Sequence, residues 1–234
     1  MFRESANIYD TIYLNMGKDY VAESKKIHAI VQRYKKTNGK FLLDVACGTG
    51  LHIGHFRQHY QVEGLDLDPG MLKIARRKYP RVRFHRANML DFVLHRKFDV
   101  ITCLFSSIGY VKTIPRLNKA IQNMGQHLKP GGVLIFEPWF TPQQWRTGKP
   151  HGTFANEPNL KIARMNVSGR KGKISLLDFH YLVATSEGVK YFSESHELGL
   201  FTHVEYLRAF KNAGLKVIHD KKGLDGRGLY IGLK

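Results

Sequence analysis

Short apolar runs alternate with amphipathic segments along the first three-fifths of the chain. Each run has the length of a strand, and the runs lie at residues 41–45, 62–66, 82–87, 98–105 and 133–139. The run FDVITCLF at 98–105 is almost continuously apolar, as expected for a strand at the centre of a parallel sheet. Strict alternation of strand and helix predicts an α/β fold with a doubly wound, Rossmann-like and mostly parallel sheet.

Helices are expected between these runs, at 19–36, from the glycines at 48–50 to about residue 60, at 69–79 and from 113 onward. Asp19 is placed to cap the first of them. Asp68 and Pro69 form an N-cap and first-turn pair that opens the third. Capping residues and helical spacing of apolar residues therefore indicate the same boundaries.

The pattern changes after the fifth strand. Three strand-like runs between about 160 and 200 are separated by the turn signals SGRKGK and TSEG, which is typical of an antiparallel meander. Thr202 and Glu205 then form a capping box, and two closing strands bring the main sheet to seven. We expect an N-terminal lid or helical segment at 1–38, a main domain at 39–158 and 201–234, and an inserted antiparallel β subdomain on the substrate side at 159–200.

The composition, with 43% hydrophobic residues among 234, is that of a globular protein with one sizeable domain. No window approaches the ~20 apolar residues of a membrane span, and the first residues lack the apolar stretch of an export signal. Cys47 and Cys103 lie in apolar, strand-like contexts, which suggests reduced thiols. The expected location is the cytoplasm, without a membrane partner.

Basic residues are in excess, with 37 Lys and Arg against 19 acidic residues and a formal net charge of +18. Such an excess raises the question of a nucleic-acid partner. The charges fall in short clusters such as Lys25-Lys26 and Arg76-Arg77, without a basic tail. We therefore favour a solvated basic surface over nucleic acid, and a negatively charged small substrate agrees with either. The 12 histidines lack metal-ligand spacing, so no metal site is expected.

The sequence LDVACGTG joins the first strand to the next helix and predicts a ligand site at the carboxyl end of the sheet. Gly48 and Gly50 let the backbone approach a ligand closely. Asp66 ends the second strand, where a carboxylate suits both hydroxyls of a ribose. Gly54 stands one residue too late for a dinucleotide fingerprint, and the P-loop Gly-Lys-Ser/Thr is missing. Asp44 would repel a pyrophosphate but suits an amino-acid ammonium, so the best-fitting cofactor is S-adenosylmethionine.

The ordered motifs LDVACGTG, GLDLD, ANMLDF, FDVITCLFSSIGY and LKPGGVLIFEPW resemble those of class I S-adenosylmethionine-dependent methyltransferases. A closer resemblance extends over nearly the whole chain. The segments YDTIYLNMGKDY, LFSSIGYVKT, EPWF, ELGLFTHVEYLRAFKNAGL and GLDGRGLYIGL are similar to the amino-sugar N,N-dimethyltransferases that make desosamine- and mycaminose-type nucleotide sugars. The resemblance implies an N-methyltransferase that releases S-adenosylhomocysteine. Its implied substrate is a small amine, with a nucleotide-diphosphate amino sugar as the leading candidate.

The resemblance also implies a set of cofactor contacts. The family commonly has Asp at the position of Asn88, but an Asn oxygen still accepts the same hydrogen bond. The contacts are Asp44, Ala46, Gly48 and Gly50 for the methionine part, Asp66 for the ribose, Leu67 and Met71 for the adenine faces, Asn88 for the adenine amino group, and the Met89 amide for the ring, with Tyr13, Tyr20 and Leu104 completing the set.

Methyl transfer from a sulfonium is an in-line displacement, so the protein must align a neutral nucleophile and exclude water. The catalytic candidates are Tyr13, Tyr110 and Glu137. The resemblance places Tyr13 beside the transferred methyl, whereas packing is the favoured role of Tyr9. Tyr110 could hydrogen-bond the amine or relay its proton, but its unperturbed pKa of ~10 makes it a poor base, and an amine deprotonated by solvent is an equal alternative. Glu137 could accept a hydrogen bond from the substrate or hold the loop that follows.

Substrate contacts are expected from Ser106, Tyr110, Trp139 and Arg227. Arg227 lies between two glycines, where the family is expected to contact the nucleotide diphosphate, and Arg pairs with phosphate through two hydrogen bonds. A simple Gly-Arg-Gly turn is the alternative. His52, directly after the glycine turn, is expected to support the site without catalysing.

Two alternatives to the amino-sugar N-methyltransferase stay open, and so does association with a second copy of the chain. The net charge motivates an RNA methyltransferase, although no RNA-binding module is visible and EPWF does not match the Asn/Asp-Pro-Pro-Tyr motif used on base amines. A noncatalytic S-adenosylmethionine-binding protein is the second alternative. A homodimer is compatible with the sequence.

Overall fold

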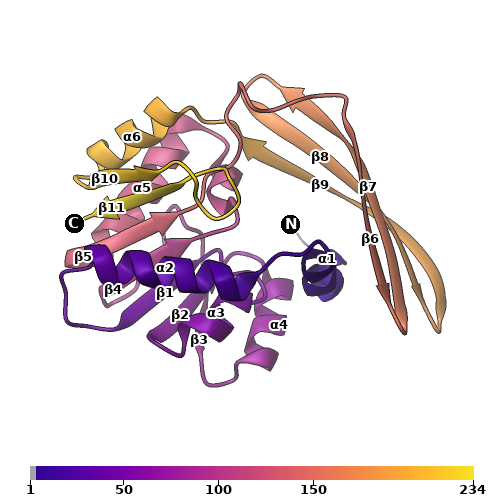
Figure 1. Cartoon of the computed structure of the whole chain (residues 1–234), viewed down its shortest axis with the longest axis horizontal. Helices are drawn as coiled ribbons and strands as arrows, with labels where there is room; N and C mark the ends of the chain where they lie inside the picture. The colour runs from indigo at the N-terminus through magenta and orange to yellow at the C-terminus, as the bar shows by residue number, and fades with distance from the viewer. Residues whose placement is uncertain (1–3) are drawn as a thin grey trace.

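The computed structural model describes residues 4–234 as two β-sheets with helices packed around the larger one (Figure 1). Residues 1–3 of the expected N-terminal segment lie outside the described residues. The elements in chain order are η1 (Ser5–Ile8), α1 (Tyr9–Asn15), α2 (Tyr20–Tyr34), β1 (Phe41–Val45), α3 (Leu51–Phe56), β2 (Gln61–Asp66), α4 (Pro69–Lys78), β3 (Arg83–Arg86), β4 (Phe98–Cys103), η2 (Ser107–Val111), α5 (Ile114–Gln126), β5 (Leu128–Phe136), β6 (Pro150–Glu157), β7 (Leu160–Lys171), β8 (Ile174–Thr185), β9 (Gly188–Gly199), α6 (His203–Asn212), β10 (Lys216–Asp220) and β11 (Leu229–Leu233).

The larger sheet has seven strands in the order β10-β11-β5-β4-β1-β2-β3. The strands β1 to β5 pair in parallel, whereas β11 runs antiparallel to both β5 and β10. Every residue of β4 is buried, as expected for a central strand with helices on both faces. The predicted doubly wound, mostly parallel sheet is confirmed. Its order reverses between β1 and β4, which is where open α/β sheets bind ligands.

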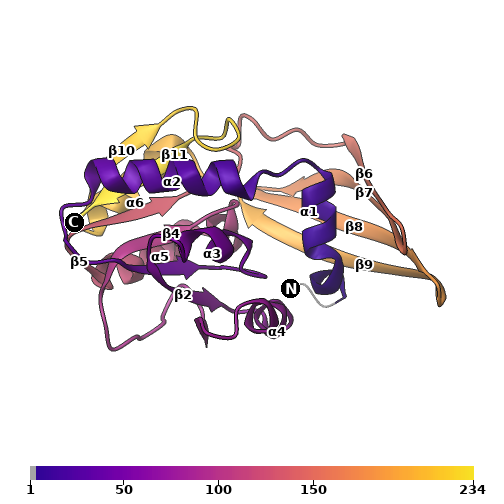
Figure 2. The ribbon, with the colours of Figure 1, turned by 60° about the horizontal axis from the view of Figure 1, so that its bottom comes forward.

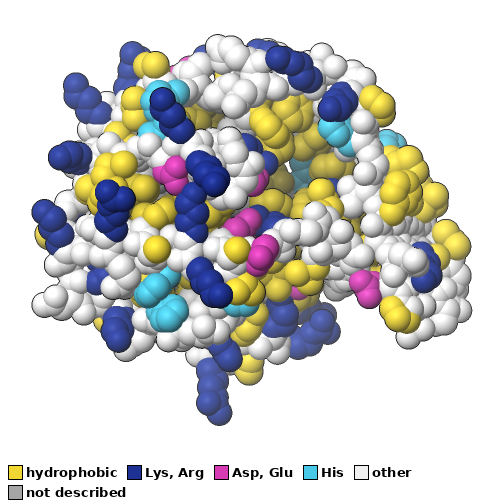
Figure 3. All heavy atoms as spheres, in the orientation of Figure 1, with side chains coloured by type: hydrophobic (Ala, Val, Ile, Leu, Met, Phe, Trp, Pro, Cys, Tyr) yellow, Lys and Arg dark blue, Asp and Glu magenta, His cyan; other side chains and the backbone are white. Residues whose placement is uncertain are grey.

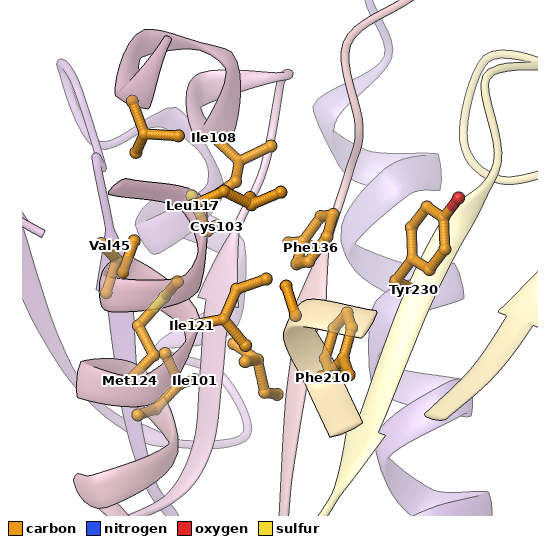
Figure 4. Packing of buried hydrophobic residues seen from close by; sticks show 14 of the residues in the cluster. Val45, Ile101, Cys103, Ile108, Leu117, Ile121, Met124, Phe136, Phe210 and Tyr230 are labelled. Atoms are coloured by element: carbon orange, nitrogen blue, oxygen red, sulfur yellow. The ribbon is translucent and has the colours of Figure 1, made fainter. Parts of the chain in front are cut away.

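Two apolar clusters cover the two faces of this sheet. On one face Ile27 and Val31 of α2 pack with residues of α3, β1 and β4. On the other face Ile121 of α5 lies close to Phe136 of β5 and Phe210 of α6, as Figure 4 shows. The rings of Phe136 and Phe210 stack with centroids 5.1 Å apart. This packing fixes the carboxyl ends of the central strands, and the loops that follow them, in one place.

The predicted helix caps are present. The Asp19 carboxylate accepts a hydrogen bond from the Ala22 amide at 2.8 Å. Asp68 accepts from the amides of Gly70 and Met71, so it satisfies two of the donors that a helix start leaves exposed. Thr202 and Glu205 form the complete capping box of α6. These local signals were therefore reliable in the sequence.

Two predicted boundaries shift. The helix α3 ends at Phe56 rather than near residue 60, because the chain must turn back to begin β2, where the Gln61 amide donates to the Lys40 carbonyl at 2.8 Å. The strand β5 begins at Leu128, earlier than expected, and ends at Phe136. Glu137 and Trp139 consequently follow the strand instead of belonging to it.

The second sheet is antiparallel and has four strands in the order β6-β7-β8-β9, where the sequence predicted three. It also begins at Pro150, ahead of the expected segment 159–200. The strand β6 was missed because its sequence PHGTFANE contains Pro and Gly and alternates weakly. Pairing along its whole length with β7, from Pro150 opposite Val167 to Glu157 opposite Leu160, makes it a strand.

The two faces of the second sheet differ in exposure. Directly paired residues share a face, and side chains alternate along each strand. On the inner face Ile162, Arg164, Asn166 and Ser168 of β7 are buried. The outer face carries a set of exposed apolar side chains, which are Phe154, Met165, Val167, Leu182, Val189 and Tyr191.

The N-terminal segment lies between the two sheets, as Figure 2 shows for α1. Ile8 and Ile12 pack against the inner face of the second sheet through Ala155, Ile162 and Tyr181. The preceding turn packs against α4, where Ala6 contacts the cluster of Met71 and Ile74. The segment thus covers the region between the two sheets. Among residues 4–234 there is no helix with the length and apolar character needed to cross a membrane.

Candidate active site

A cavity of about 590 Å³ lies between the carboxyl ends of the large sheet, the N-terminal segment and the inner face of the second sheet. Figure 3 shows the surface hollowed between the main body and the second sheet. A smaller pocket of about 40 Å³ adjoins it and shares Tyr9, Ala46, Gly48 and Phe105 with its wall. The volume suits a small-molecule ligand or a pair of reactants.

The loop after β1 supplies backbone to both pockets. Ala46, Gly48 and Gly50 all have positive φ angles, of 57°, 56° and 80°. Ala46 and Gly48 line the cavity as expected. Gly50 does not line either pocket: it opens α3 in the left-handed conformation, and a Cβ there would point toward the Tyr79 ring at 3.3 Å. Its expected cofactor contact is therefore replaced by a structural role in the turn.

Asp44 lies at the end of β1 and is only 3% exposed. Its carboxylate accepts a hydrogen bond from the Thr102 hydroxyl at 2.8 Å. Burial raises the pKa of Asp44 to about 7, against the lowering effect of that hydrogen bond. The carboxyl lines the smaller pocket, where a ligand ammonium would restore its charge.

Asp66 lies at the end of β2 and lines the larger cavity. One carboxylate oxygen accepts from the Gly48 amide and the other from the Asp68 amide, both at 2.8 Å. Burial raises its pKa although these amides oppose the shift. The carboxylate thus joins the glycine loop to the loop after β2, and each oxygen keeps a second lone pair for a ligand hydroxyl.

The expected adenine contacts come together on one wall. Leu67, Met71, Asn88 and Met89 all line the larger cavity. The Asn88 side-chain oxygen accepts from the Leu90 amide at 3.1 Å, which orients the amide group. Two further expected contacts lie elsewhere, since Tyr20 and Leu104 line the smaller pocket beside Asp44.

Tyr13 lines the larger cavity, among aromatic rings. Its ring meets Phe105 edge-on with centroids 4.7 Å apart, and the Tyr9 ring lies 4.6 Å away. The Arg164 guanidinium donates to the Tyr13 hydroxyl at 3.2 Å. The expected role of Tyr13 beside the transferred methyl stays a prediction.

The expected substrate contacts lie on the cavity wall, but several use their polar atoms within the protein. The Ser106 hydroxyl donates to the Pro138 carbonyl at 2.7 Å, and the Trp139 indole donates to the Ser175 hydroxyl at 2.9 Å. The Tyr110 hydroxyl lies 2.8 Å from Nδ1 of His196. Tyr110 is 36% exposed, but desolvation within the cavity wall raises the pKa of its phenol above the usual value, so the phenol stays neutral.

Glu137 does not line either pocket, and its expected direct part in catalysis is not supported by its position. The carboxylate is fully buried and accepts from the Phe105 amide at 2.6 Å and from Arg227 at 3.1 Å. Burial raises its pKa, and the ion pair with Arg227 opposes that shift. Phe105 and Ser106 have positive φ angles of 53° and 60°, an unfavourable backbone that these bonds hold in place. The alternative, that Glu137 holds a loop, fits the structure.

Arg227 lines the larger cavity next to Trp139. Its guanidinium pairs with Glu137 and Asp225 through the same nitrogen. Nε of Arg227 is buried and has no hydrogen-bond partner among the residues that the structure describes. His52 lines the smaller pocket, and its Nε2 lies 2.8 Å from a Glu23 carboxylate oxygen.

Three residues of the site were missed. Arg164 of β7, with Glu194 and His196 of β9, lies on the inner face of the second sheet, and each is buried or nearly so. Within residues 4–234 no carboxylate pairs with Arg164, which instead lies over the rings of Phe179 and Tyr13. The period-two alternation of β7 and β9 would have placed them on one face, but no sequence signal indicated that this face meets the cavity.

The residues present fit S-adenosylmethionine. A buried carboxyl faces the smaller pocket, a second carboxylate faces the larger cavity, and an apolar wall with one amide lies beside it, as the ammonium, ribose and adenine of that cofactor require. The fold and the site define a class I S-adenosylmethionine-dependent methyltransferase.

Comparisons with known proteins agree and are more specific. Residues 42–132 match the family model of a methyltransferase domain. The chain is 39% identical over 232 residues, 98% of each chain, to the dTDP-3-amino-3,4,6-trideoxy-alpha-D-glucopyranose N,N-dimethyltransferase of Streptomyces venezuelae. It is 38% identical to the dTDP-4-amino-2,3,4,6-tetradeoxy-D-glucose N,N-dimethyltransferase of Saccharopolyspora spinosa, covering 99% of this chain and 93% of that relative.

Solved structures show the same relationship. The crystal structure of DesVI from Streptomyces venezuelae superposes with a TM-score of 0.93 at 39% identity, covering 98% of both chains. An amino pentose methyltransferase from Micromonospora echinaspora, solved with S-adenosylmethionine bound, gives 0.88 at 35% identity, covering 97% of this chain and 96% of that one. This chain belongs to the family of sugar N,N-dimethyltransferases.

Proposed function

We propose that this protein transfers methyl groups from S-adenosylmethionine to the amine of a nucleotide-diphosphate amino sugar. The supporting observation is the cavity, whose wall runs from the Asp66 carboxylate to the inner face of the second sheet and includes Tyr110 and Arg227. The relatives named as dTDP-amino-sugar N,N-dimethyltransferases match over nearly their whole length, so they contain the same second sheet as well as the cofactor domain.

The cofactor residues have distinct roles in this proposal. Asp44 binds the ammonium, with Ala46, Gly48, Tyr20 and Leu104 around the methionine part. The ribose hydroxyls donate to Asp66, which the Gly48 and Asp68 amides already hold in position. The adenine lies between Leu67 and Met71, near Asn88 and the Met89 amide. When bound, S-adenosylmethionine supplies an electrophilic methyl group on a sulfonium.

Tyr13 and Phe105 exclude water and align the amine with the methyl group. Their edge-on rings are held from two sides, by Arg164 on the Tyr13 hydroxyl and by Glu137 on the Phe105 amide. Fixed rings on the path between amine and methyl restrict the substrate to a near-attack geometry. Glu137 is thus a positioning residue, and Tyr110 contacts the amine.

The reaction is tested with purified protein, S-adenosylmethionine and a panel of dTDP-linked 3-amino and 4-amino sugars. We expect S-adenosylhomocysteine to form together with a product heavier by one or two methyl units on one of them. The matched dTDP sugar with a hydroxyl in place of the amine serves as the control. Product formation on none of the amino sugars would contradict the proposal.

The same preparation tests RNA methylation. Figure 3 shows Lys and Arg side chains scattered over the visible face, without one continuous basic stripe. We therefore expect only weak, nonspecific RNA binding in a gel-shift titration. Tight binding with a steep salt dependence, together with methylation of RNA, would favour that alternative instead.

Arg227 is proposed to bind the diphosphate through its guanidinium group, because the side chain lines the larger cavity. Phosphate oxygens form strong, charge-assisted hydrogen bonds with guanidinium donors. Replacing Arg227 with Gln should raise KM for the nucleotide sugar by about tenfold or more, since a charge-assisted hydrogen bond contributes about 1.5–3 kcal/mol. Steady-state kinetics with the exposed Arg208→Gln as control measure the change. An unchanged KM would remove Arg227 from the substrate site.

The remaining expectations on organisation are part of the same proposal. The N-terminal segment up to residue 38 closes the cavity from residue 4 onward, the main domain at 39–149 and 201–234 binds the cofactor, and the second sheet, which begins at Pro150, binds the substrate. We place the protein in the cytoplasm, in agreement with two cysteines that form no disulfide.

A homodimer is proposed through the exposed apolar outer face of the second sheet, where Leu182 and Tyr191 are directly paired and 47% and 61% exposed. Exposed apolar patches of this kind mark association surfaces. Light scattering should give a mass twice that of the chain, and Leu182→Lys should reduce it to one chain. A monomeric wild-type protein would contradict the proposal.

A further inference from the structure

Tyr110 and His196 approach the cavity from different parts of the fold. Tyr110 belongs to η2, which follows β4 of the large sheet, whereas His196 belongs to β9 of the second sheet. Both side chains line the cavity, and the Tyr110 hydroxyl lies 2.8 Å from Nδ1 of His196. His196 is only 3% exposed, so its other contacts come from the protein.

Glu194 lies two residues before His196 on the same face of β9. One of its oxygens is 3.7 Å from Nε2 of His196. The same carboxylate accepts hydrogen bonds from the Ser5 hydroxyl and from the amides of Ser5 and Glu4. Burial acts to raise the pKa of Glu194, but the adjacent His196 and the hydrogen bonds from Ser5 and Glu4 outweigh it and lower the pKa to about 2. A negative charge therefore stands beside the far nitrogen of the imidazole at every working pH.

The phenol of Tyr110 does not ionise in this site, because burial raises its pKa. A neutral phenol can still pass a proton when its own hydrogen is directed to an acceptor and its oxygen accepts from a donor on the other side. Nδ1 of His196 is such an acceptor when the ring hydrogen is on Nε2. Other titratable or charged groups face this pair from the surrounding elements. They are Tyr9 and Tyr13 of α1, Asp66 of β2, the Lys112–Glu197 ion pair beside η2 and β9, Arg164 of β7, and Asp178 and Tyr181 of β8.

We propose that Tyr110 and His196 form a two-step proton relay for the substrate amine, with Glu194 stabilising the imidazolium. This inference rests on the proposed function. The substrate ammonium gives a proton to the Tyr110 oxygen while the Tyr110 hydrogen moves to Nδ1 of His196. The products are a neutral amine, an unchanged phenol and an imidazolium. The nitrogen lone pair then forms the N–C bond, and the C–S electron pair returns to sulfur.

The relay explains how the site can use an amine at neutral pH. An amine with a pKa near ~8 is mostly protonated at pH 7, and its ammonium has no lone pair for attack. With a relay the protein binds the ammonium and removes the proton inside the cavity. The imidazolium then releases its proton to solvent before the next transfer. His196 acts through Tyr110, so it is a positioning residue and not a direct contact of the reacting atoms.

The relay predicts a specific behaviour for His196→Asn. The Asn oxygen can occupy the place of Nδ1 and accept the Tyr110 hydrogen bond, but it cannot take up a proton. We expect kcat at pH 7 to fall about 100-fold, which is within the range of general acid–base catalysis, with little change in KM. We also expect activity to recover as pH rises through the pKa of the substrate amine. A merely structural change would lower activity equally at all pH values.

Two further variants separate the members of the relay. Glu194→Gln removes the negative charge beside the imidazole, which makes the imidazolium less stable. In the pH profile of kcat, the fall in activity on the acidic side should therefore move to lower pH. Glu187→Gln, an exposed carboxylate in the turn before β9, should leave this fall in place. Tyr110→Phe should resemble His196→Asn, and the double variant should be no slower than either single one because both break the same path.

The outcomes distinguish this inference from the proposed function. Wild-type kcat and an unmoved fall in activity on the acidic side in His196→Asn would overturn the relay while leaving the methyltransferase activity intact. If the wild-type protein methylates no nucleotide amino sugar, the proposed function fails. Nitrogen NMR of His196 then still tests the hydrogen-bond arrangement of the relay, because it shows which ring nitrogen carries the hydrogen. A neutral His196 with hydrogen on Nε2 and an accepting Nδ1 supports the relay. Hydrogen on Nδ1 overturns it.

Discussion

Replacing Asp44 with Asn is expected to stabilise the protein without cofactor at pH 8 and at the same time to weaken S-adenosylmethionine binding about 10- to 100-fold. Asn has the same shape and can still accept the hydrogen bond from the Thr102 hydroxyl. It has no charge, so it loses the proposed charge-assisted bond to the cofactor ammonium, which contributes about 1.5–3 kcal/mol.

The stability effect follows from the pKa of Asp44, which burial raises from 3.8 to about 7. Between these two values the unfolded chain loses this proton while the folded protein keeps it, so the carboxyl lowers the stability of the wild-type protein progressively as pH rises from about 4 to 7. Above pH 7 the penalty is constant and reaches about 4 kcal/mol at most. The advantage of Asn should consequently be smaller at pH 5 than at pH 8.

Thermal unfolding at both pH values and calorimetry with the cofactor measure the two effects. Asp99→Asn is a matched control with the opposite sign, because Asp99 is also buried but is paired with Lys129 and with the Phe41 amide. Burial acts to raise the pKa of Asp99, but these hydrogen bonds outweigh it and lower the pKa, so its replacement should destabilise the protein at pH 8. A lower melting temperature for Asp44→Asn would show that the buried Asp44 carboxylate does not lower the stability of the folded protein.

Replacing Asp66 with Asn is expected to weaken cofactor binding by about 100-fold or more. Two ribose hydroxyls donate to this carboxylate in the proposed complex, and hydrogen bonds to a charged group contribute about 1.5–3 kcal/mol each. The change also removes one acceptor for the amides of Gly48 and Asp68, so the glycine loop loses part of its support. The melting temperature should change little, because removing a buried carboxylate with a raised pKa offsets the loss of this acceptor.

Calorimetry with S-adenosylhomocysteine measures the affinity without turnover. Asp91→Asn is the control, since Asp91 is exposed, carries the same charge and does not line either pocket. An Asp66→Asn protein that binds as tightly as the control would contradict the placement of the ribose, and with it the orientation of the cofactor along the cavity.

Most strands and helices of the large sheet could be predicted from the sequence, because each is specified by residues within or next to it. A strand buried on both faces has to be continuously apolar, and β4 is. Helix starts need acceptors for exposed amides, and Asp19, Asp68 and Thr202 supply them. Gly48 and Asp66 were recognisable from their spacing. A glycine turn follows the first strand, and a carboxylate ends the second strand about twenty residues after the first carboxylate.

The departures have a common cause in contacts between distant segments. The strand β6 exists because β7 pairs with it, and its own residues do not require extended structure. Glu137 looked available at the end of a strand, but the left-handed backbone at Phe105 brings an amide to its carboxylate. Gly50 shares a motif with cavity residues and nevertheless faces Tyr79.

The sequence by itself determined the sheet, its caps and the carboxylates Asp44 and Asp66 that line the two pockets, since periodicity and spacing are properties of a continuous stretch of chain. Only the tertiary structure decided which residues of the second sheet meet the active site. Arg164 and His196 enter the cavity because the inner face of that sheet packs over η2 and the N-terminal segment. A one-residue change of register would turn both side chains to solvent, and nothing within their own strands excludes it.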